Sequence, residues 1–581
     1  MNTSLRKFLD KHINGVSCNE MLKVFPLPCG VGKSEYIKYL ISDALNKNYG
    51  LIVVTDEVER LNSYTAAQDE QLTEYIQRNI HRISILSSAT IATEAKVLYA
   101  KPIVLMCTQR YFDLSINEIK QFTATRKKIV FDEKPYIFAT YKLTIESLNN
   151  VDSALKVGLD DTVNQSDKAL LVSVWETIST ALQTALKENE ALNTDYKREE
   201  YFNFSAFTDI QTAEVFFSLV GKYKPQLRKY SVGITKIIDA VEQLMTEGVI
   251  TSQKAKYKNS GNSYDNYFTV LINNIHKLTA TDAAVFVLDG TSDISPEYDL
   301  NCVEKVDCHK FQPDLRCLTI NIVNVNTSKD RLTKSGDKID SLIETIIEYI
   351  KSQPQNINTV FTYKGIADNF KDLFDNVNWF GNIKGTNQYR EVCHICQVGL
   401  NRYPDLTYML YANAIGQFND HSTGYNNRIY DKETIDDIRC RLILADIEQN
   451  LYRSKIRNKD NKENCTYTLV CNVDERSRIF ETYRPLLDMI KARYKSFGAT
   501  VRYIETPAQF KLLKAKERKT QNKTTLQKFE EWIRKQPEGR IFKRADIMSE
   551  CNINESQFKD LKKTGILNGF TTDKQGVYKV K

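Results

Sequence analysis

The sequence predicts an α/β protein with two parallel sheets, a mostly helical insertion and a small C-terminal domain. Three observations support this prediction. Short β-rich runs alternate with helical stretches over residues 21–140, as in a doubly wound parallel sheet. Residues 141–280 have helical spacing and few β signals, and residues 281–506 return to the alternating pattern. A basic segment then leads into a final compact unit, residues 524–581.

Length and composition indicate an ordinary globular chain. At about 150 residues per domain, 581 residues suggest three to four domains. The chain is 42% hydrophobic and 26% charged, which excludes disorder throughout. Apolar runs are far shorter than the ~20 residues that span a bilayer, and no signal-peptide core is present, so we expect no membrane span. Twelve cysteines are too sparse for a disulfide scaffold, which favours reduced thiols in an intracellular, cytoplasmic protein.

Positive charge is concentrated at the C-terminal end. The net charge is +7, but residues 511–581 hold 18 Lys and Arg against 9 Asp and Glu, a net of +9. The first 510 residues therefore sum to about −2. This asymmetry points to a polyanion partner for the C-terminal region.

The first sheet is expected within a domain of residues 1–140. Its predicted strands are Leu22–Phe25, Leu51–Thr55, Ile83–Leu86, Ile103–Cys107 and Lys128–Phe131. These runs are mostly apolar rather than alternating, as expected for strands that are covered on both faces.

The insertion is expected over residues 141–280. Lys168–Asn193 and Thr208–Val220 have helical spacing, and Lys256–Tyr264 is expected to be a loop. No motif in this region can be assigned a chemistry, so a protein partner is one interpretation of its role.

The second sheet is expected in residues 301–506, while residues 281–300 return to the first domain. The predicted strands are Ala284–Leu288, Leu318–Val323, Thr359–Tyr363, Val392–Val398 and Tyr467–Val470, and the predicted helices are Ile339–Lys351 and Thr434–Gln449. Residues 507–523 are expected to form a basic linker.

A candidate phosphate-binding loop follows the first predicted strand. Its residues Gly30, Val31, Gly32, Lys33 and Ser34 lie between a strand and a helix, which is the context a P-loop requires. Glycines let backbone N–H groups face a phosphate, Lys33 can reach the β and γ phosphates, and the Ser34 hydroxyl can bind Mg²⁺. Leu27 stands where the full motif has a glycine. The alternative is a chance glycine-rich turn.

Two carboxylates end the strand at Lys128–Phe131. Asp132 would hold Mg²⁺ through water, and Glu133 would orient and deprotonate an attacking water. An isolated Asp-Glu pair is often a solvated turn. Together with an upstream P-loop, it predicts the second half of a nucleotide site.

These residues resemble a divergent superfamily-two helicase, with two RecA-like domains and a DExx box. Gly30–Ser34 resembles motif I and Asp132-Glu133-Lys134-Pro135 resembles motif II. Val54-Thr55-Asp56 resembles motif Ia and Thr108-Gln109-Arg110 resembles motif Ib. The resemblance covers most of residues 22–470 apart from the insertion. It implies ATP and Mg²⁺ as cofactors and nucleic-acid contacts through Thr55, Thr108 and Arg110.

The remaining motifs depart further from the family pattern. Leu288-Asp289-Gly290-Thr291 stands where the family has Ser-Ala-Thr, and Gly385-Thr386-Asn387 resembles motif V with Asn387 in place of Asp. The resemblance implies nucleic-acid contacts through Thr386 and Asn387.

The segment from Gln449 to Arg457 resembles motif VI. We expect Gln449, Arg453 and Arg457 to share one helix face, at i, i+4 and i+8. The resemblance implies catalytic roles for all three, with the arginines as arginine fingers. The alternative is a solvated basic face.

The C-terminal unit resembles a winged helix. Thr524–Gln536, Ala545–Cys551 and residues 554–563 are expected to be helices, with strand-like pieces Gly565–Leu567 and Gly576–Tyr578 around Thr571–Gln575. In that fold the third helix faces a nucleic-acid groove, so Lys559, Lys562 and Lys563 would contact phosphates. A protein-docking winged helix is the alternative.

Three functions are compatible with these motifs. The favoured function is an ATP-dependent helicase or translocase on nucleic acid, with DNA preferred over RNA. One alternative is a helicase-like ATP-binding scaffold in replication or defence, and another is a nucleotide kinase. Cys393-His394-Ile395-Cys396 has zinc-ligand spacing, but no second CxxC exists, so buried thiols are favoured over structural zinc.

Overall fold

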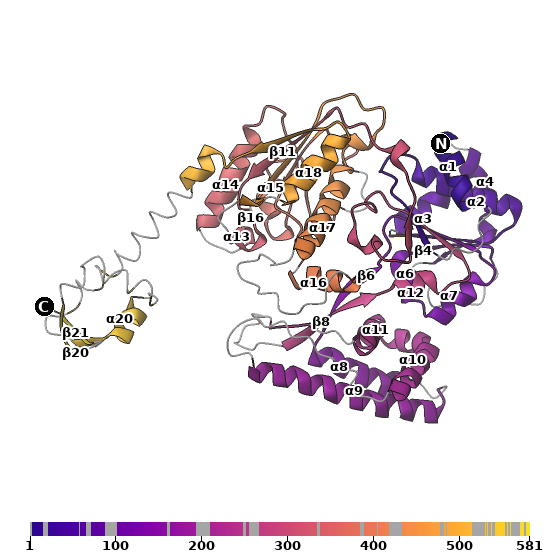
Figure 1. The fold of residues 1–581 in the computed structure, drawn as a ribbon, viewed down its shortest axis with the longest axis horizontal. Coiled ribbons are helices and arrows are strands. Elements are labelled where there is room, and N and C mark those ends of the chain that lie inside the picture. The colour runs from indigo at the N-terminus through magenta and orange to yellow at the C-terminus, as the bar shows by residue number, and fades with distance from the viewer. Residues whose placement is uncertain are drawn as a thin grey trace.

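The fold was analysed in a computed structural model of the chain. The structure describes residues 3–14, 21–56, 58–65, 71–86, 101–159, 163–192, 210–247, 251–254, 266–333, 337–383, 388–403, 405–416, 433–473, 475–476, 482–483, 485–513, 529, 532, 536, 541–551, 555, 558, 570–574 and 577–580. Two large parallel sheets, each flanked by helices, form an α/β fold with two RecA-like domains (Figure 1).

The first domain is built on a seven-stranded parallel sheet. Its strands, in spatial order, are β10 (Val303–Lys305), β1 (Leu22–Phe25), β9 (Ala284–Leu288), β5 (Lys128–Asp132), β2 (Leu51–Thr55), β4 (Ile103–Cys107) and β3 (Ile83–Leu86). The strand runs predicted for this domain are confirmed. The sequence did not indicate β10, a three-residue edge strand whose side chains are largely exposed.

Alternate side chains of these strands enter two different cores. Val24, Val54 and Phe131 belong to one apolar cluster, with residues of α6 (Thr108–Asp113), α7 (Ile116–Thr123) and α12 (Ile275–Thr279). Phe25, Val53 and Val130 belong to the other, with α1 (Thr3–Ile13), α2 (Lys33–Lys47), α3 (Val58–Thr65) and α4 (Gln71–Arg78). Burial of both faces explains why the strand sequences are almost continuously apolar.

The second domain contains a six-stranded parallel sheet. Its spatial order is β13 (Asn376–Trp379), β12 (Thr359–Thr362), β14 (His394–Val398), β15 (Cys465–Cys471), β11 (Leu318–Asn324) and β18 (Thr500–Ile504). One face packs against α17 (Glu433–Leu451) and α18 (Pro485–Ser496). The other packs against α13 (Lys329–Thr333), α14 (Asp337–Lys351) and α15 (Asp368–Lys371).

The insertion between β5 and β9 is not only helical. Its helices are α8 (Ile145–Ser153), α9 (Gln165–Leu192), α10 (Ile210–Tyr230) and α11 (Val232–Glu247), with a π-helical turn, η3 (Ala154–Gly158). An antiparallel sheet of β6 (Phe138–Leu143), β8 (Asn266–Asn273) and β7 (Thr251–Lys254) accompanies them. The pairing partners β6 and β8 lie far apart in the sequence, and such non-local pairing leaves a weak local signal. The predicted loop Lys256–Tyr264 lies outside the described residues.

Helix α9 is the longest of the four insertion helices that the structure describes. Its segment Gln165–Lys187 is long and apolar enough to cross a membrane by length and composition alone, and 44% of the most apolar window is buried inside the protein. Trp175 and Leu182 of this helix pack in the apolar core of the insertion. This packing is what a core helix requires.

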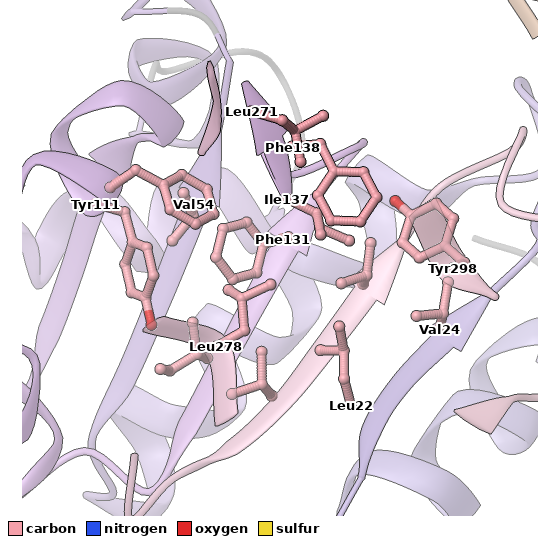
Figure 2. Packing of buried hydrophobic residues seen from close by; sticks show 14 of the residues in the cluster. Leu22, Val24, Val54, Tyr111, Phe131, Ile137, Phe138, Leu271, Leu278 and Tyr298 are labelled. Carbon is pink, nitrogen blue, oxygen red and sulfur yellow. The ribbon is translucent and has the colours of Figure 1, made fainter. Parts of the chain in front are cut away.

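A continuous apolar core joins the first sheet to the stem of the insertion. Figure 2 shows Leu22, Phe131, Phe138 and Leu271 within this cluster. Helix α16 (Asp405–Ala414) of the second domain also enters it, with Tyr411 set edge-on to Phe138 at a centroid distance of 5.1 Å. The two sheet domains and the insertion stem are therefore packed together in this structure.

The C-terminal unit contains a three-stranded antiparallel sheet. Its order is β19 (Ile541–Lys543), β21 (Val577–Val580) and β20 (Phe570–Lys574), and α20 (Arg544–Glu550) follows β19. The two strand-like pieces were expected on either side of Thr571–Gln575, whereas most of these residues form β20 and pair with β21. Most of the other expected helices, and Gly565–Leu567, lie outside the described residues. In Figure 1 this sheet stands apart from the two large ones.

Candidate nucleotide site between the two domains

The strand register of the first sheet aligns the predicted site residues along one edge. Phe25 pairs with Leu288, Leu288 with Asp132, Asp132 with Thr55, and Thr55 with Cys107. Since all these strands are parallel, the chain leaves each of them at the same edge of the sheet. The P-loop, the segment after β9 and the two acidic residues therefore emerge side by side.

The phosphate-binding loop has the backbone geometry that its glycines permit. Gly30 and Gly32 have φ values of +81° and +104°, in the region that favours glycine. Gly32 is the N-cap of α2, so the loop runs directly into a helix N-terminus. Lys33 is buried, and its Nζ donates a hydrogen bond to the Leu27 carbonyl at 2.8 Å. Ser34 is exposed at the first turn of α2. This geometry fits a phosphate cradle.

The two carboxylates of the predicted motif II are bound by helix α3. The guanidinium of Arg60 lies 2.8 Å from Oε1 of Glu133 and 3.5 Å from Oδ2 of Asp132. The Tyr64 hydroxyl, one turn further along α3, donates a hydrogen bond to the same Oδ2. Asp132 is almost fully buried, whereas the Glu133 side chain is 27% exposed. Glu133 is therefore the more accessible of the two to a water or ligand.

The surroundings shift the pKa values of the two carboxyls in opposite directions. Burial raises the pKa of Asp132, despite the nearby charge of Arg60. Burial would also raise the pKa of Glu133, but the positive charges of Arg60, Arg453 and Lys33 outweigh it and hold that pKa below its usual value. Glu133 is therefore an anion at neutral pH.

The second domain places its predicted arginines at this site, although not as one helix face. Helix α17 ends at Leu451, Arg453 lies in the following turn, and Arg457 closes a 3-10 turn, η8 (Lys455–Arg457). The expected i, i+4, i+8 arrangement is therefore wrong. The helix stops because Ser454 has extended backbone angles, and its hydroxyl accepts the Ile456 N–H instead of continuing the helix.

Arg457 packs directly on the phosphate-binding loop. A Cβ atom built on Gly30 would lie 1.9 Å from the Arg457 carbonyl oxygen, so this position has no room for a side chain. Burial lowers the pKa of Arg457, and the charges of Arg453, Arg390 and Arg60 lower it further. An anionic ligand such as a polyphosphate would offset this repulsion at Arg457.

The segment after β9 joins the phosphate-binding loop to the second domain. A Cβ atom on Gly290 would lie 3.0 Å from the Leu27 carbonyl oxygen and 3.6 Å from Lys33 Nζ, so this glycine allows close contact with the loop. Further along, Asp293 lies 2.7 Å from the guanidinium of Arg493 in α18. Asp299 lies 2.6 Å from the guanidinium of Arg441 in α17. One short segment therefore contacts both the nucleotide site and two helices of the second domain.

The chain is distantly similar to several solved structures. No family model matches the sequence, and no curated protein matches it. A structure of S. tokodaii Xpd4 is 12% identical, with a TM-score of 0.43, over 86% of this chain and 98% of that chain. The crystal structure of T4 UvsW is 10% identical, with a TM-score of 0.18, over 84% of this chain and 74% of that chain.

A third similar structure is that of the DUF1998 helicase MrfA bound to DNA and AMPPNP. It is 10% identical, with a TM-score of 0.28, over 86% of this chain and 51% of that chain. The assignment of two RecA-like domains depends on the two parallel sheets of this chain itself.

The described residues that were predicted to contact nucleic acid are buried or half-buried. Thr55 and Thr108 are buried at the carboxyl ends of β2 and β4, so their side chains do not face solvent. Arg110 is half-buried on α6, close enough to Glu118 to help lower the pKa of that carboxyl. The predicted contacts Thr386, Asn387, Lys559, Lys562 and Lys563 lie outside the described residues.

Gln449 is not joined to the phosphate-binding loop. It is half-buried in the last turn of α17, and no hydrogen bond or ion pair connects it to the loop within the described residues. The zinc interpretation gains no support either. Cys396 is buried in β14, and the described part of the chain has no group of three metal-ligating side chains.

Two residues of the site were missed in the sequence. Arg60 and Tyr64 carry no motif, and their place in the site depends on strand order. Because β2 lies next to β5, the helix after β2 reaches the carboxyl end of β5. An arginine in the first turns of that helix would have been a candidate, had the order of the strands been predicted.

The ion pair between Asp293 and Arg493 leads to a stability prediction. Arg493 also pairs with Glu448, at 2.8 Å between Nη2 and Oε1, and Glu448 is only 2% exposed. We expect Arg493→Ala to lower the free energy of unfolding of the second domain by about 3–5 kcal/mol, because it leaves a buried carboxylate without its partner. Urea unfolding would measure this loss.

The matched control for this prediction is Arg316→Ala. The pair of Arg316 with Asp314 is exposed on the surface of the same domain, where solvent screens it, so its loss should leave the free energy of unfolding almost unchanged. Equal losses in the two variants would contradict the assignment of Arg493 as a buried partner.

Proposed function

We propose that this protein is an ATP-dependent nucleic-acid helicase or translocase, with DNA as the favoured substrate. One observation supports this most directly: a P-loop, two acidic residues and two arginines from a second RecA-like domain meet at one edge of the first sheet. A site shared by two domains can couple nucleotide turnover to domain movement. A nucleotide kinase would not need the arginines of a second parallel-sheet domain.

Each residue of the site has a proposed role. The N–H groups of Gly30, Val31 and Gly32 would face the phosphates, and Lys33 would pair with the β and γ oxygens. Ser34 and Asp132 are the proposed holders of Mg²⁺, which supplies charge neutralisation at the phosphates when bound.

The remaining roles concern the attacking water and the developing charge. Glu133 would orient the water and accept its proton. Arg453 and Arg457 would stabilise negative charge on the γ-phosphoryl group while the two domains are together. Gln449 is also proposed to act at this interface between the two domains. It would have to move toward the phosphate-binding loop when the domains close.

ATP turnover with different nucleic acids tests this proposal. Phosphate release should be measured without nucleic acid and with single-stranded DNA, duplex DNA or RNA. We expect turnover that single-stranded DNA stimulates most, and no turnover in Lys33→Ala. Nucleotide binding without turnover under every condition would favour the ATP-binding scaffold instead.

The C-terminal unit is proposed to be a winged helix that binds nucleic acid. We expect a variant lacking residues 524–581 to bind DNA more weakly but to retain stimulated ATP turnover at higher DNA concentration. Residues 524–581 carry 12 Lys and Arg against 8 Asp and Glu, a net of +4, and phosphate contacts release counterions, so affinity should fall more steeply with salt in the full chain. Filter binding or fluorescence anisotropy across a salt series measures both slopes.

Equal affinities and equal salt slopes for the two proteins would contradict this assignment. That result would favour a C-terminal unit that docks a protein partner.

A further inference from the structure

Glu133 has a backbone conformation that needs external support. Its φ of +89° lies in the left-handed region, which residues with a Cβ atom seldom adopt. Such conformations persist where the surrounding structure fixes them, and they are concentrated at functional sites. Here the Glu133 N–H donates to the Leu288 carbonyl at 3.3 Å, and Arg60 holds the side chain at 2.8 Å. The backbone and the carboxylate are thus each bound at one point.

Helix α3 presents two polar side chains toward the acidic pair from adjacent turns. Arg60 and Tyr64 are four residues apart, so they lie on one helix face. Tyr64 is fully buried in the apolar core between α3 and the sheet, which fixes the position of this face. The contacts described above engage Oδ2 of Asp132 and Oε1 of Glu133. These contacts do not involve Oδ1 of Asp132 or Oε2 of Glu133.

We propose that Arg60 is a positioning residue that aims the carboxylate of Glu133 into the nucleotide site. This inference rests on the proposed ATP hydrolysis and adds a residue that no motif assigns. Nη1 of Arg60 makes both contacts, and a guanidinium suits the role because its planar group fixes the direction of that nitrogen and stays charged. Tyr64 supports the neighbouring carboxylate, and the packed ring keeps α3 in place. Arg60 itself does not contact the reacting atoms.

Steady-state kinetics of Arg60 variants test the proposal. In Arg60→Ala, kcat for ATP should fall about 10- to 100-fold, as for other residues that orient a catalytic group, while KM changes less than about threefold. Arg60→Lys should recover part of the loss, because lysine restores the charge but not the planar donors. Arg78→Ala is the matched control, since Arg78 forms an exposed pair with Glu74 on the neighbouring helix α4. It should leave both constants unchanged.

A double-mutant cycle separates positioning from a general effect on folding. If Arg60 acts through Glu133, adding Arg60→Ala to Glu133→Gln should not lower the remaining turnover further. The melting temperature gives a readout without turnover. Arg60→Ala should lower Tm less in the Glu133→Gln background than in the wild type, because the charge it compensates is reduced.

The outcomes are distinguishable. Wild-type kcat in Arg60→Ala, or an equal effect of Arg60→Ala in both Glu133 backgrounds, would overturn the role of Arg60 alone. Absence of ATP turnover in the wild type under all nucleic-acid conditions would overturn the proposed function, and this inference with it. If Arg60→Ala fails to fold, Arg60→Lys is measured in its place. A wild-type kcat and an unchanged Tm in Arg60→Lys would show that the planar guanidinium is not needed.

Discussion

Glu133→Gln should abolish ATP turnover while leaving ATP bound. The substitution keeps the size of the side chain and removes the base, so kcat should fall by at least about 10²- to 10⁴-fold. Affinity for ATP should stay close to that of the wild type, because the P-loop contacts remain. Single-turnover hydrolysis and equilibrium binding of a fluorescent ATP analogue measure the two quantities separately.

Lys33→Ala provides the contrast for that experiment. Lys33 carries charge to the phosphates, so its loss should weaken nucleotide binding as well as turnover. Near-normal hydrolysis in Glu133→Gln would remove this residue as the general base. Equal loss of affinity in the two variants would show that Glu133 contributes to binding rather than to the chemical step.

Arg453→Ala should lower kcat by about 10³-fold or more with little change in ATP affinity. Arginines that stabilise the transferred phosphoryl group contribute on this scale, and they act mainly in the transition state. The charge of Arg453 already reaches Glu133 across the domain boundary, where it helps to lower the pKa of that carboxyl. Pre-steady-state kinetics with saturating single-stranded DNA would measure the chemical step directly.

Arg457→Ala is also expected to lower kcat, because Arg457 acts in the same state, with the two domains together. Because both arginines stabilise one state, the double variant should lose less than the product of the two single effects. Arg390→Ala offers a comparison, because the charge of Arg390 also acts on Arg457 but Arg390 lies outside motif VI. Normal turnover in both Arg453→Ala and Arg457→Ala would contradict their assignment as arginine fingers.

Elements could be predicted from the sequence where neighbouring residues in the chain carry the whole signal. Strands such as Leu51–Thr55 and Ala284–Leu288 are observed with the bounds that were predicted, because burial on both faces leaves a continuous apolar run. The P-loop could be predicted for a similar reason, since its glycines, lysine and helix start are consecutive. The strands β6 and β8 could not, because they are stabilised by each other across more than a hundred residues of chain.

The site itself was predictable only in part. Lys33, Asp132 and Glu133 were found by motif, whereas Arg60 and Tyr64 depend on β2 lying beside β5. The helical spacing assigned to Arg453 and Arg457 failed at one residue. Ser454 ends the helix through its own hydrogen bond, and the turn that follows brings the Arg457 carbonyl against Gly30. Tertiary contacts of this kind leave no periodic trace in the sequence.

The pairing of β6 with β8 makes the insertion a replaceable module. Phe138 pairs with Asn273 and Leu143 with Phe268, so the chain enters and leaves the insertion as two neighbouring strands of one ladder. Antiparallel partners lie only about 5 Å apart, and a ladder can be closed by a two-residue turn. Closing a longer or shorter chain beyond this ladder would therefore change the entropic cost for the first domain only slightly. Evolution could exchange the helices α8 to α11 for other domains at this point while the nucleotide site keeps its geometry.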